Sequence, residues 1–360
     1  MKIMDNLHHP RIGIIGGMGN EAMVDLMLKM ASLPAQRDYQ FVAFGNARLA
    51  YKPQEVMQQW LPTDIPELRK YDTAAYTLRL MQYLAVDQLG LACNSAHELF
   101  RRILPNIPVT FVDMIKQTAT SLQGCQESVL VMGVSSLIES KLYQTALTEE
   151  GIKATQPSAD NQAKIMEAIY NPSFGIKTAK ITHQAETLLC EVIRDEIVKQ
   201  GCTKVILGCT ELPLALTAIS CQRFKAQGLL PENVEVIDAS MALAQALVSI
   251  QGQSDALIQP LATYQGQYLD WAQPLAFKVS SLVEAIAIQQ RIFDYTVDYL
   301  TERNQSLAGS YFHLPTLFFS APAADIEHKL QALGIDVYCG INALDDIIED
   351  KLAQYYSDFE

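Results

Sequence analysis

Arg11-Ile-Gly-Ile-Ile-Gly-Gly17 is an apolar run that ends in a glycine turn, the pattern of a buried strand followed by a tight connection. Val129-Leu-Val-Met-Gly133 repeats this pattern later in the chain. The final glycines of the two runs are 116 residues apart, and the same separation divides Cys93 from Cys209, each of which also follows an apolar run. Two landmarks with one separation predict a duplicated α/β unit, and the duplication predicts a cleft between its two related halves.

The composition of the chain is that of a folded protein with two or three domains, because 49% of its 360 residues are hydrophobic and 19% are charged. A net charge of −13 argues against a phosphate-binding surface, so we expect no nucleic acid as a partner. The first residues lack the apolar core of a signal peptide, and no apolar run approaches the length of a membrane span. We therefore expect a cytoplasmic protein that does not bind a membrane.

The seven cysteines include no Cys-x-x-Cys spacing, which favours reduced thiols over a disulfide framework. Free cysteine behaves as a small buried hydrophobe. We expect five of the seven to be inert core residues, namely Cys125, Cys190, Cys202, Cys221 and Cys339.

Short apolar strands alternate with helix-period segments over the first 250 residues, which predicts parallel sheets with helices on both faces. The fold class is thus α/β, with two pseudo-symmetric doubly wound parallel-sheet domains, the active site between them, and a C-terminal α+β extension. Strands are expected at Arg11–Ile15, Phe41–Phe44, Gln88–Ala92, Val109–Val112, Ser128–Met132, Lys204–Leu207 and Val234–Ile237. The clearest helices are expected at Asn20–Ser32, Thr73–Leu84 and Gln184–Gln200.

The predicted domain order is discontinuous, because we expect Val234–Ile237 and the helix after it to complete the first sheet. The first domain then comprises residues 1–115 with 218–250, and the second comprises 116–217. After a linker at Gln251, the extension 251–360 is predicted to hold a long helix, a short βαβ-like segment and an acidic final helix, at Ser280–Glu302, Thr316–Cys339 and the C-terminus. It is interpreted as a packing or oligomerisation module, with a lid over the cleft as the alternative.

The turn Gly17-Met-Gly19-Asn-Glu-Ala22 matches the G-x-G-x-x-A pattern of dinucleotide sites. Such a site needs an acidic residue at the end of the second strand, where Phe41–Phe44 is followed by Gly45-Asn46 instead. We therefore expect no nicotinamide cofactor. The glycines still allow backbone N–H groups to hold a carboxylate at the start of the next helix.

The positions of Cys93 and Cys209 suit acid–base chemistry, because a helix N-terminus lowers the pKa of a thiol and each cysteine precedes an expected helix. A thiolate and a thiol on opposite faces of a carbon atom remove a proton from one side and return one from the other, which inverts the centre. The six histidines are scattered and no Schiff-base lysine context is recognisable, so we expect neither a metal nor pyridoxal phosphate.

The carbanion formed in such a reaction needs its carboxylate neutralised, so hydrogen-bond donors should surround it. Five residues near the predicted turns supply such donors, and their alternative role is turn formation or helix capping: Asn94, Ser95, Ser135, Ser136 and Thr210.

Three motifs together resemble the aspartate/glutamate racemase family, the cofactor-independent amino-acid racemases that use two cysteines. They are Gly13-Ile-Ile-Gly-Gly-Met-Gly19, Cys93-Asn-Ser-Ala-His97 and Gly208-Cys-Thr-Glu211, and the resemblance covers Ile12 to Leu247. It implies a fold of two pseudo-symmetric α/β domains with the active site between them. It also implies that Cys93 faces the Cα proton of the D-enantiomer and Cys209 that of the L-enantiomer. Because family members are often dimers, a homodimer is considered.

The resemblance further implies that Asn94, Ser95 and Thr210 bind the α-carboxylate or amine of a small amino acid, with Met18 in the first turn beside them. His97 and Glu211 are similar to residues that either tune a thiol or brace its loop. Lys177 resembles a lysine that binds the distal carboxylate, with an exposed loop lysine as the alternative.

Departures from the family put the substrate in question. Asn20 replaces a usual proline and Ser95 a usual threonine, which are mild changes. The family arginine that grips the side-chain carboxylate is absent, and Lys52 or Arg48 is left to replace it, although lysine lacks the bidentate geometry of arginine. Aspartate or glutamate is the first expectation, and a broader range of amino acids is the second. The alternatives in function are a related maleate isomerase, hydantoin racemase or decarboxylase, or a non-catalytic amino-acid-binding protein.

Overall fold

The computed structural model describes residues 9–34, 38–50, 66–104, 109–178, 180–249, 274–303 and 314–357. Lys52 and the linker predicted at Gln251 lie outside these residues. The backbone of Arg48 is described but its side chain is not.

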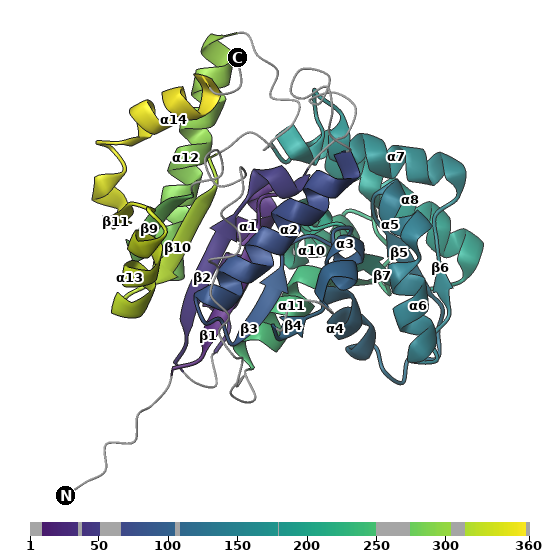
Figure 1. Ribbon diagram of the computed structural model, residues 1–360. Coiled ribbons are helices and arrows are strands. Elements are labelled where there is room, and N and C mark those ends of the chain that lie inside the picture. Colours follow the sequence, from purple (N-terminus) through teal and green to yellow (C-terminus); the bar gives the residue numbers. More distant parts are fainter. Residues whose placement is uncertain are drawn as a thin grey trace, which may run out of the picture.

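Two sets of parallel strands have the same spatial order (Figure 1). The first set lies in the order β2-β1-β3-β4 and comprises β1 (Arg11–Gly16), β2 (Gln40–Gly45), β3 (Gln88–Leu91) and β4 (Phe111–Val112). The second set lies in the order β6-β5-β7-β8 and comprises β5 (Val129–Met132), β6 (Ala154–Thr155), β7 (Lys204–Leu207) and β8 (Glu235–Asp238). We call residues 11–120 the first unit and residues 129–238 the second unit. The predicted α/β fold with two pseudo-symmetric parallel sheets is confirmed.

Helices connect these strands. The first unit contains α1 (Asn20–Ser32), the 3-10 helix η1 (Ala47–Ala50), α2 (Pro66–Tyr83), α3 (His97–Ile103) and α4 (Met114–Thr120). The second unit contains α5 (Ser135–Ser140), α6 (Leu142–Glu149), α7 (Ala159–Tyr170), the 3-10 helix η3 (Ile176–Thr178), α8 (His183–Gln200), α9 (Leu212–Ala215) and α10 (Ala218–Ala226), and α11 (Ala239–Val248) follows it. Local signals set several ends: α8 begins where the Thr182 hydroxyl accepts a bond from Ala185 N–H and ends at Gly201, which has a left-handed backbone.

The strand predicted at Val234–Ile237 belongs to the second sheet, so its assignment to the first sheet is wrong. It is observed as β8 and pairs in parallel with β7, the preceding strand along the chain. In the second unit it therefore has the place that β4 has in the first. The helix that follows β8, α11, does pack against the first unit, where it contacts α1 and α4.

Residues 275–357 form a C-terminal module that continues the first sheet. It contains β9 (Leu275–Val279), α12 (Leu282–Glu302), β10 (Thr316–Ser320), α13 (Ala324–Ala332), β11 (Val337–Cys339), the 3-10 helix η5 (Ile341–Ala343) and α14 (Ile348–Ser357). β10 pairs antiparallel with β2, which gives a seven-stranded sheet of order β11-β9-β10-β2-β1-β3-β4. In Figure 1 the module lies on the far side of the first unit from the second unit. β2 is therefore an interior strand and not the edge that β6 is in the second sheet.

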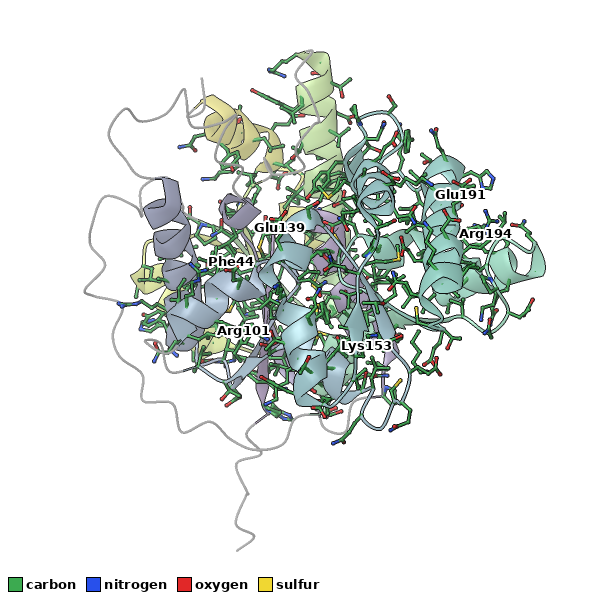
Figure 2. All side chains as sticks on the ribbon, turned by 90° about the vertical axis from the view of Figure 1, so that its right-hand side faces the viewer. Phe44, Arg101, Glu139, Lys153, Glu191 and Arg194 are labelled. Carbon is green, nitrogen blue, oxygen red and sulfur yellow. The ribbon has the colours of Figure 1, made fainter. Side chains whose placement is uncertain are left out.

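Helices cover both faces of the first sheet. Successive residues of a strand point to opposite sides, so each strand contributes side chains to two cores. Ile12 and Ile14 enter a core shared with α1, α4, α11 and α12, and this core continues into the second unit. Ile15 and Phe44 enter a separate core with α2, α3 and α13. Strands that are apolar on both faces are typical of buried parallel sheets. Figure 2 shows Glu191 and Arg194 on the outer side of α8, at the edge of the molecule farthest from Phe44.

Cys190, Cys202 and Cys221 are buried, as predicted. Cys339 is exposed at the end of β11 and Cys125 is partly exposed, so the prediction of core positions is wrong for Cys339 and only partly right for Cys125. Among the described helices, none has the length and apolar character needed to cross a membrane.

Candidate functional site

Cys93 lies in the turn after β3. The strand ends at Leu91 and α3 begins at His97, so the cysteine sits at the carboxyl edge of the first sheet, where doubly wound folds bind ligands. Its side chain is partly exposed, and its Sγ atom lies 3.7 Å from the Oγ atom of Ser95.

His97 is fully buried behind this turn and bonds to backbone at both ring nitrogens. Nε2 accepts a hydrogen bond of 3.1 Å from the N–H of Met114, so Nδ1 carries the proton and donates to the Cys93 carbonyl at 2.7 Å. Burial lowers the pKa of His97, which favours the neutral ring. Of the two roles considered for His97, the geometry favours bracing the cysteine loop against the start of α4.

Asn94 is buried and is held from across the junction between the units. The hydroxyl of Tyr143, on α6 of the second unit, donates to its Oδ1 atom at 2.6 Å. The Nδ2 atom is buried and has no hydrogen-bond partner among the described residues. The side chain therefore presents an amide donor whose orientation is fixed by Tyr143. Sequence reasoning missed Tyr143, because a tyrosine inside a helix gives no signal for this contact.

Cys209 occupies the equivalent turn after β7 in the second unit. Its thiol is buried and donates to the Oε2 atom of Glu211 at 2.8 Å. Thr210 donates its hydroxyl to the same oxygen at 3.3 Å. The Glu211 carboxylate is thus the hydrogen-bond acceptor of the second cysteine turn.

Lys177, from η3, links that carboxylate to the first unit. Its Nζ atom forms an ion pair with Oε1 of Glu211 and donates to the carbonyl of Met18 at 3.2 Å. A Cβ atom on Gly19 would lie 2.5 Å from Oε1 of Glu211 and 3.3 Å from Nζ of Lys177. The glycine turn of one unit therefore touches the cysteine turn of the other, and the close approach explains the glycine. The alternative of an exposed lysine is wrong, since the side chain is largely buried.

Both thiols have a raised pKa. Burial raises the pKa of Cys93, and the negative charge of Glu211 raises it further, while Lys177 lowers it. Burial and Glu211 also raise the pKa of Cys209 well above its usual value, again against Lys177. The prediction that helix N-termini lower both pKa values is wrong, because desolvation dominates and the helix after Cys209 is only the four residues of α9. The same ion pair acts on both cysteines, so both lie within its electrostatic range.

Glu21 is a further ionisable residue at this junction, and sequence reasoning missed it. It lies in the first turn of α1, two residues after Gly19, where an acidic residue is expected simply to complement the helix dipole. Both of its carboxylate oxygens are buried and have no hydrogen-bond partner in the described structure. Burial raises its pKa, its own backbone N–H and Lys177 lower it, and Glu211 raises it. Glu21 is therefore near the ion pair without being bonded to it.

Ser135 and Ser136 begin α5, the helix after β5, and two further predicted residues cannot be placed. Ser135 accepts a hydrogen bond of 3.3 Å from Gln162, and Ser136 is exposed at the start of α5. The side chains of Arg48 and Lys52 are outside the described residues. Within the described ranges, no group of three or more His, Cys, Asp or Glu residues is arranged to hold a metal ion.

These contacts give the junction the parts for proton transfer at carbon. One thiol follows the third strand of each unit, and the thiol of Cys209 donates a hydrogen bond to the carboxylate of Glu211. The buried amide donor of Asn94 lies in the first cysteine turn, and the buried carboxyl group of Glu21 lies near the Lys177–Glu211 pair. An arrangement of this kind suits a small molecule that carries both a carboxylate and a cation.

Comparison with known proteins agrees with this geometry. The family model described as Asp/Glu/hydantoin racemase matches residues 12–247, which end before the C-terminal module. The broad specificity amino-acid racemase RacX of Bacillus subtilis is 23% identical over 250 residues, which cover 66% of this chain and 96% of that protein. A glutamate racemase of a Sulfurihydrogenibium species is 27% identical over 187 residues, which cover 49% of this chain and 64% of that protein.

Two solved structures share the fold. Picrophilus torridus aspartate racemase has a TM-score of 0.50 at 23% identity, and the alignment covers 66% of this chain and 93% of that protein. An aspartate racemase homologue from Pyrococcus horikoshii also has a TM-score of 0.50, at 20% identity, and the alignment covers 66% of this chain and 97% of that protein.

Proposed function

The chain belongs to the Asp/Glu/hydantoin racemase family, and from this premise we propose that it is a cofactor-independent amino-acid racemase that uses Cys93 and Cys209 as its two acid–base groups. The substrate range we propose includes aspartate and glutamate and extends to other amino acids. The wider range is supported by the similarity to a relative described as a broad specificity racemase and by the missing family arginine near Lys52.

The observation that carries the proposal is the equivalence of the two cysteines. Each follows the third strand of its unit, in sheets of the same strand order, and the Lys177–Glu211 pair acts on both. A racemase needs one proton-transfer group on each face of Cα, and a duplicated fold supplies two such groups from related positions.

In the proposed reaction, the Glu211 carboxylate accepts the proton of the Cys209 thiol, to which it is already bonded. The resulting thiolate takes the Cα proton of the L-enantiomer, and the electrons of the Cα–H bond remain on Cα and its carboxylate. The Cys93 thiol then delivers its proton to the opposite face, which forms the D-enantiomer and leaves Cys93 as the thiolate. The reverse reaction starts from that state.

A raised thiol pKa makes the thiolate a stronger base once its proton has been removed. Although burial opposes it, Lys177 lowers the pKa of Glu211, so proton transfer from Cys209 to Glu211 is the costly step of the scheme. The donors proposed to bind the substrate carboxylate are the amide hydrogens of Asn94 and, once it turns away from Glu211, the hydroxyl of Thr210. Asn94 is the better placed of the two, because Tyr143 fixes its amide with Nδ2 unpartnered in the described structure.

The test is Cα hydrogen exchange in D₂O. The purified protein is incubated with single L-amino acids without pyridoxal phosphate, and Cα deuteration and D-isomer formation are followed together. Cys93→Ala and Cys209→Ala should each abolish racemisation, because inversion needs a group on both faces. Cys339→Ala, which changes an exposed cysteine, should racemise like the wild type.

Three results would count against the proposal. Full racemisation by either active-site variant would remove the two-thiol assignment. Amino-acid binding without any Cα exchange would favour a non-catalytic binding protein. Turnover of a hydantoin, maleate or a malonate-type acid, with no exchange on any amino acid, would favour a related isomerase or decarboxylase.

A further inference from the structure

Glu21 is a buried carboxyl group for which the proposed reaction has no use. It is the second residue of α1, after the glycine turn that touches Lys177 and Glu211. Neither of its oxygens has a side-chain partner in the described part of the chain, and the group that most favours its charged form is its own backbone N–H. Buried polar groups in folded proteins are almost always satisfied, so an unsatisfied carboxyl group beside an active site calls for a ligand.

The ion pair next to Glu21 does not compensate its charge. Lys177 bonds to Glu211 and to the carbonyl of Met18, and the influences of Lys177 and Glu211 on Glu21 have opposite signs. A carboxylate buried in this way is costly unless a cation reaches it. Burial thus raises the pKa of Glu21, and a cation that reaches the carboxyl group would stabilise its ionised form.

The second unsatisfied group at the junction has the opposite character. The Nδ2 atom of Asn94 is a buried donor without a partner among the described residues, and Tyr143 prevents its amide from turning. One free donor and one free acidic group complement the two charged groups of an amino acid, a carboxylate and an ammonium. The pattern does not complement a simple carboxylic acid, which would leave Glu21 without a partner.

We propose that Glu21 binds the α-ammonium group of the substrate while the Asn94 amide binds its α-carboxylate. This inference rests on the proposed racemase function and assigns a recognition residue to it. Two anchors on the same Cα fix the direction of the Cα–H bond whatever the side chain is, so recognition by these two groups is compatible with a broad range of amino acids.

The experiment compares ligands that differ in one ammonium group. L-aspartate and succinate differ only at the α-amino group, and L-lysine and L-norleucine differ only at the side-chain amino group. Dissociation constants are measured by calorimetry for the wild type, for Glu21→Gln and for Glu149→Gln. The last variant makes the same chemical change on an exposed glutamate of α6.

Glu21→Gln should weaken L-aspartate, L-lysine and L-norleucine alike, by about tenfold or more, because each loses a buried charge-assisted hydrogen bond. Succinate should bind both proteins equally, and Glu149→Gln should match the wild type throughout. The substitution removes an unpartnered acid, so we expect no loss of thermal stability. Glu21→Met, which has a similar length and no charge, repeats the test if the glutamine variant does not fold.

Unchanged binding of L-aspartate and L-norleucine by Glu21→Gln would overturn the proposal. Equal weakening of L-aspartate and succinate would also overturn it, because that result indicates a structural role. Weakening of L-lysine alone would place Glu21 at the side chain and not at the α-ammonium. Failure of the racemase function is a separate outcome, since it appears as the absence of Cα exchange in the wild type.

Discussion

Replacing Tyr143 by phenylalanine removes the hydroxyl group that bonds to Asn94 and almost no volume. The tyrosine is fully buried, and its hydroxyl donates to Oδ1 of Asn94 at 2.6 Å. In Tyr143→Phe that carbonyl oxygen stays buried without a donor, and no contact in the described structure then determines which end of the amide faces the substrate. The variant therefore tests whether the second unit orients a binding residue of the first.

The expected cost follows from the burial of both partners. Leaving a buried acceptor unsatisfied costs about 1–3 kcal/mol. In a domain of 150–250 residues each kcal/mol lowers the melting temperature by roughly 2–4 °C, so we expect a fall of several degrees. Because the same amide is proposed to hold the substrate carboxylate, kcat/KM should fall by about tenfold, a factor equivalent to about 1.4 kcal/mol.

Tyr76→Phe is the matched control. The hydroxyl of Tyr76 is also buried, but it has no hydrogen-bond partner among the described residues. Removing an unsatisfied hydroxyl should leave stability unchanged or increase it, and Tyr76 has no role in the proposed site. Thermal melts and racemisation rates are measured for both variants and the wild type.

Tyr143→Phe should therefore lose stability and activity, whereas Tyr76→Phe should lose neither. If Tyr143→Phe melts and racemises like Tyr76→Phe, the hydrogen bond to Asn94 does not orient the amide. A loss of stability with full activity would show that the contact is structural and that the orientation of Asn94 does not matter for the reaction.

Three further predictions concern the thiols, the glycine turn and acid stability. Because burial and Glu211 raise the pKa of Cys93, the rate of its alkylation by iodoacetamide should keep increasing above pH 9, as followed by mass spectrometry of the Cys93 peptide. Glu211→Gln should move this pH profile to lower pH, and an unmoved profile contradicts the assignment. Gly19→Ala places Cβ 2.5 Å from Glu211 Oε1, so kcat/KM should fall by roughly 100-fold. In the control Gly45→Ala, Cβ meets the flexible end of Met23 at 3.3 Å, and the loss of kcat/KM should be small. Equal losses in the two variants would refute the close approach. Although burial opposes it, hydrogen bonds from Ser158, Asn161 and Gln200 lower the pKa of Glu196 to about 2, below the unfolded value of 4.5. The ionised carboxylate therefore stabilises the fold by roughly 3 kcal/mol above about pH 4.5, and this stabilisation disappears as the pH falls toward 2. The stability difference between Glu196→Gln and the wild type in urea melts should shrink over that range, and a constant difference would contradict the shift.

Much of the fold could be predicted from the sequence, because short-range patterns carry it. The strand at Lys204–Leu207 and the helix at Asn20–Ser32 are observed with the predicted bounds. β6 and β9 were not predicted. The two residues of β6 are too short to show a pattern, and Leu275–Val279 is a short apolar run that fits a helix or a strand equally well.

The candidate site was predicted in its positions and not in its chemistry. The motifs placed Cys93, Asn94, Cys209, Glu211 and Lys177 in the same region, and the structure brings the last three into direct contact. Motifs could not give the pKa values of the thiols, since a pKa depends on desolvation and on charges brought close by folding.

The sequence by itself determined the duplicated unit and the place of a cysteine directly after an apolar strand in each copy, because alternation, apolar runs and glycine turns act between near neighbours in the chain. Only the tertiary structure decided that β8 joins the second sheet, that β10 pairs with β2, and that Tyr143 and Lys177 reach the turns of the other unit. Those contacts join residues far apart in the chain, and burial gives them their energy. For the same reason Glu21, an ordinary acid of a first helical turn in the sequence, is an unpartnered buried carboxyl group in the folded protein.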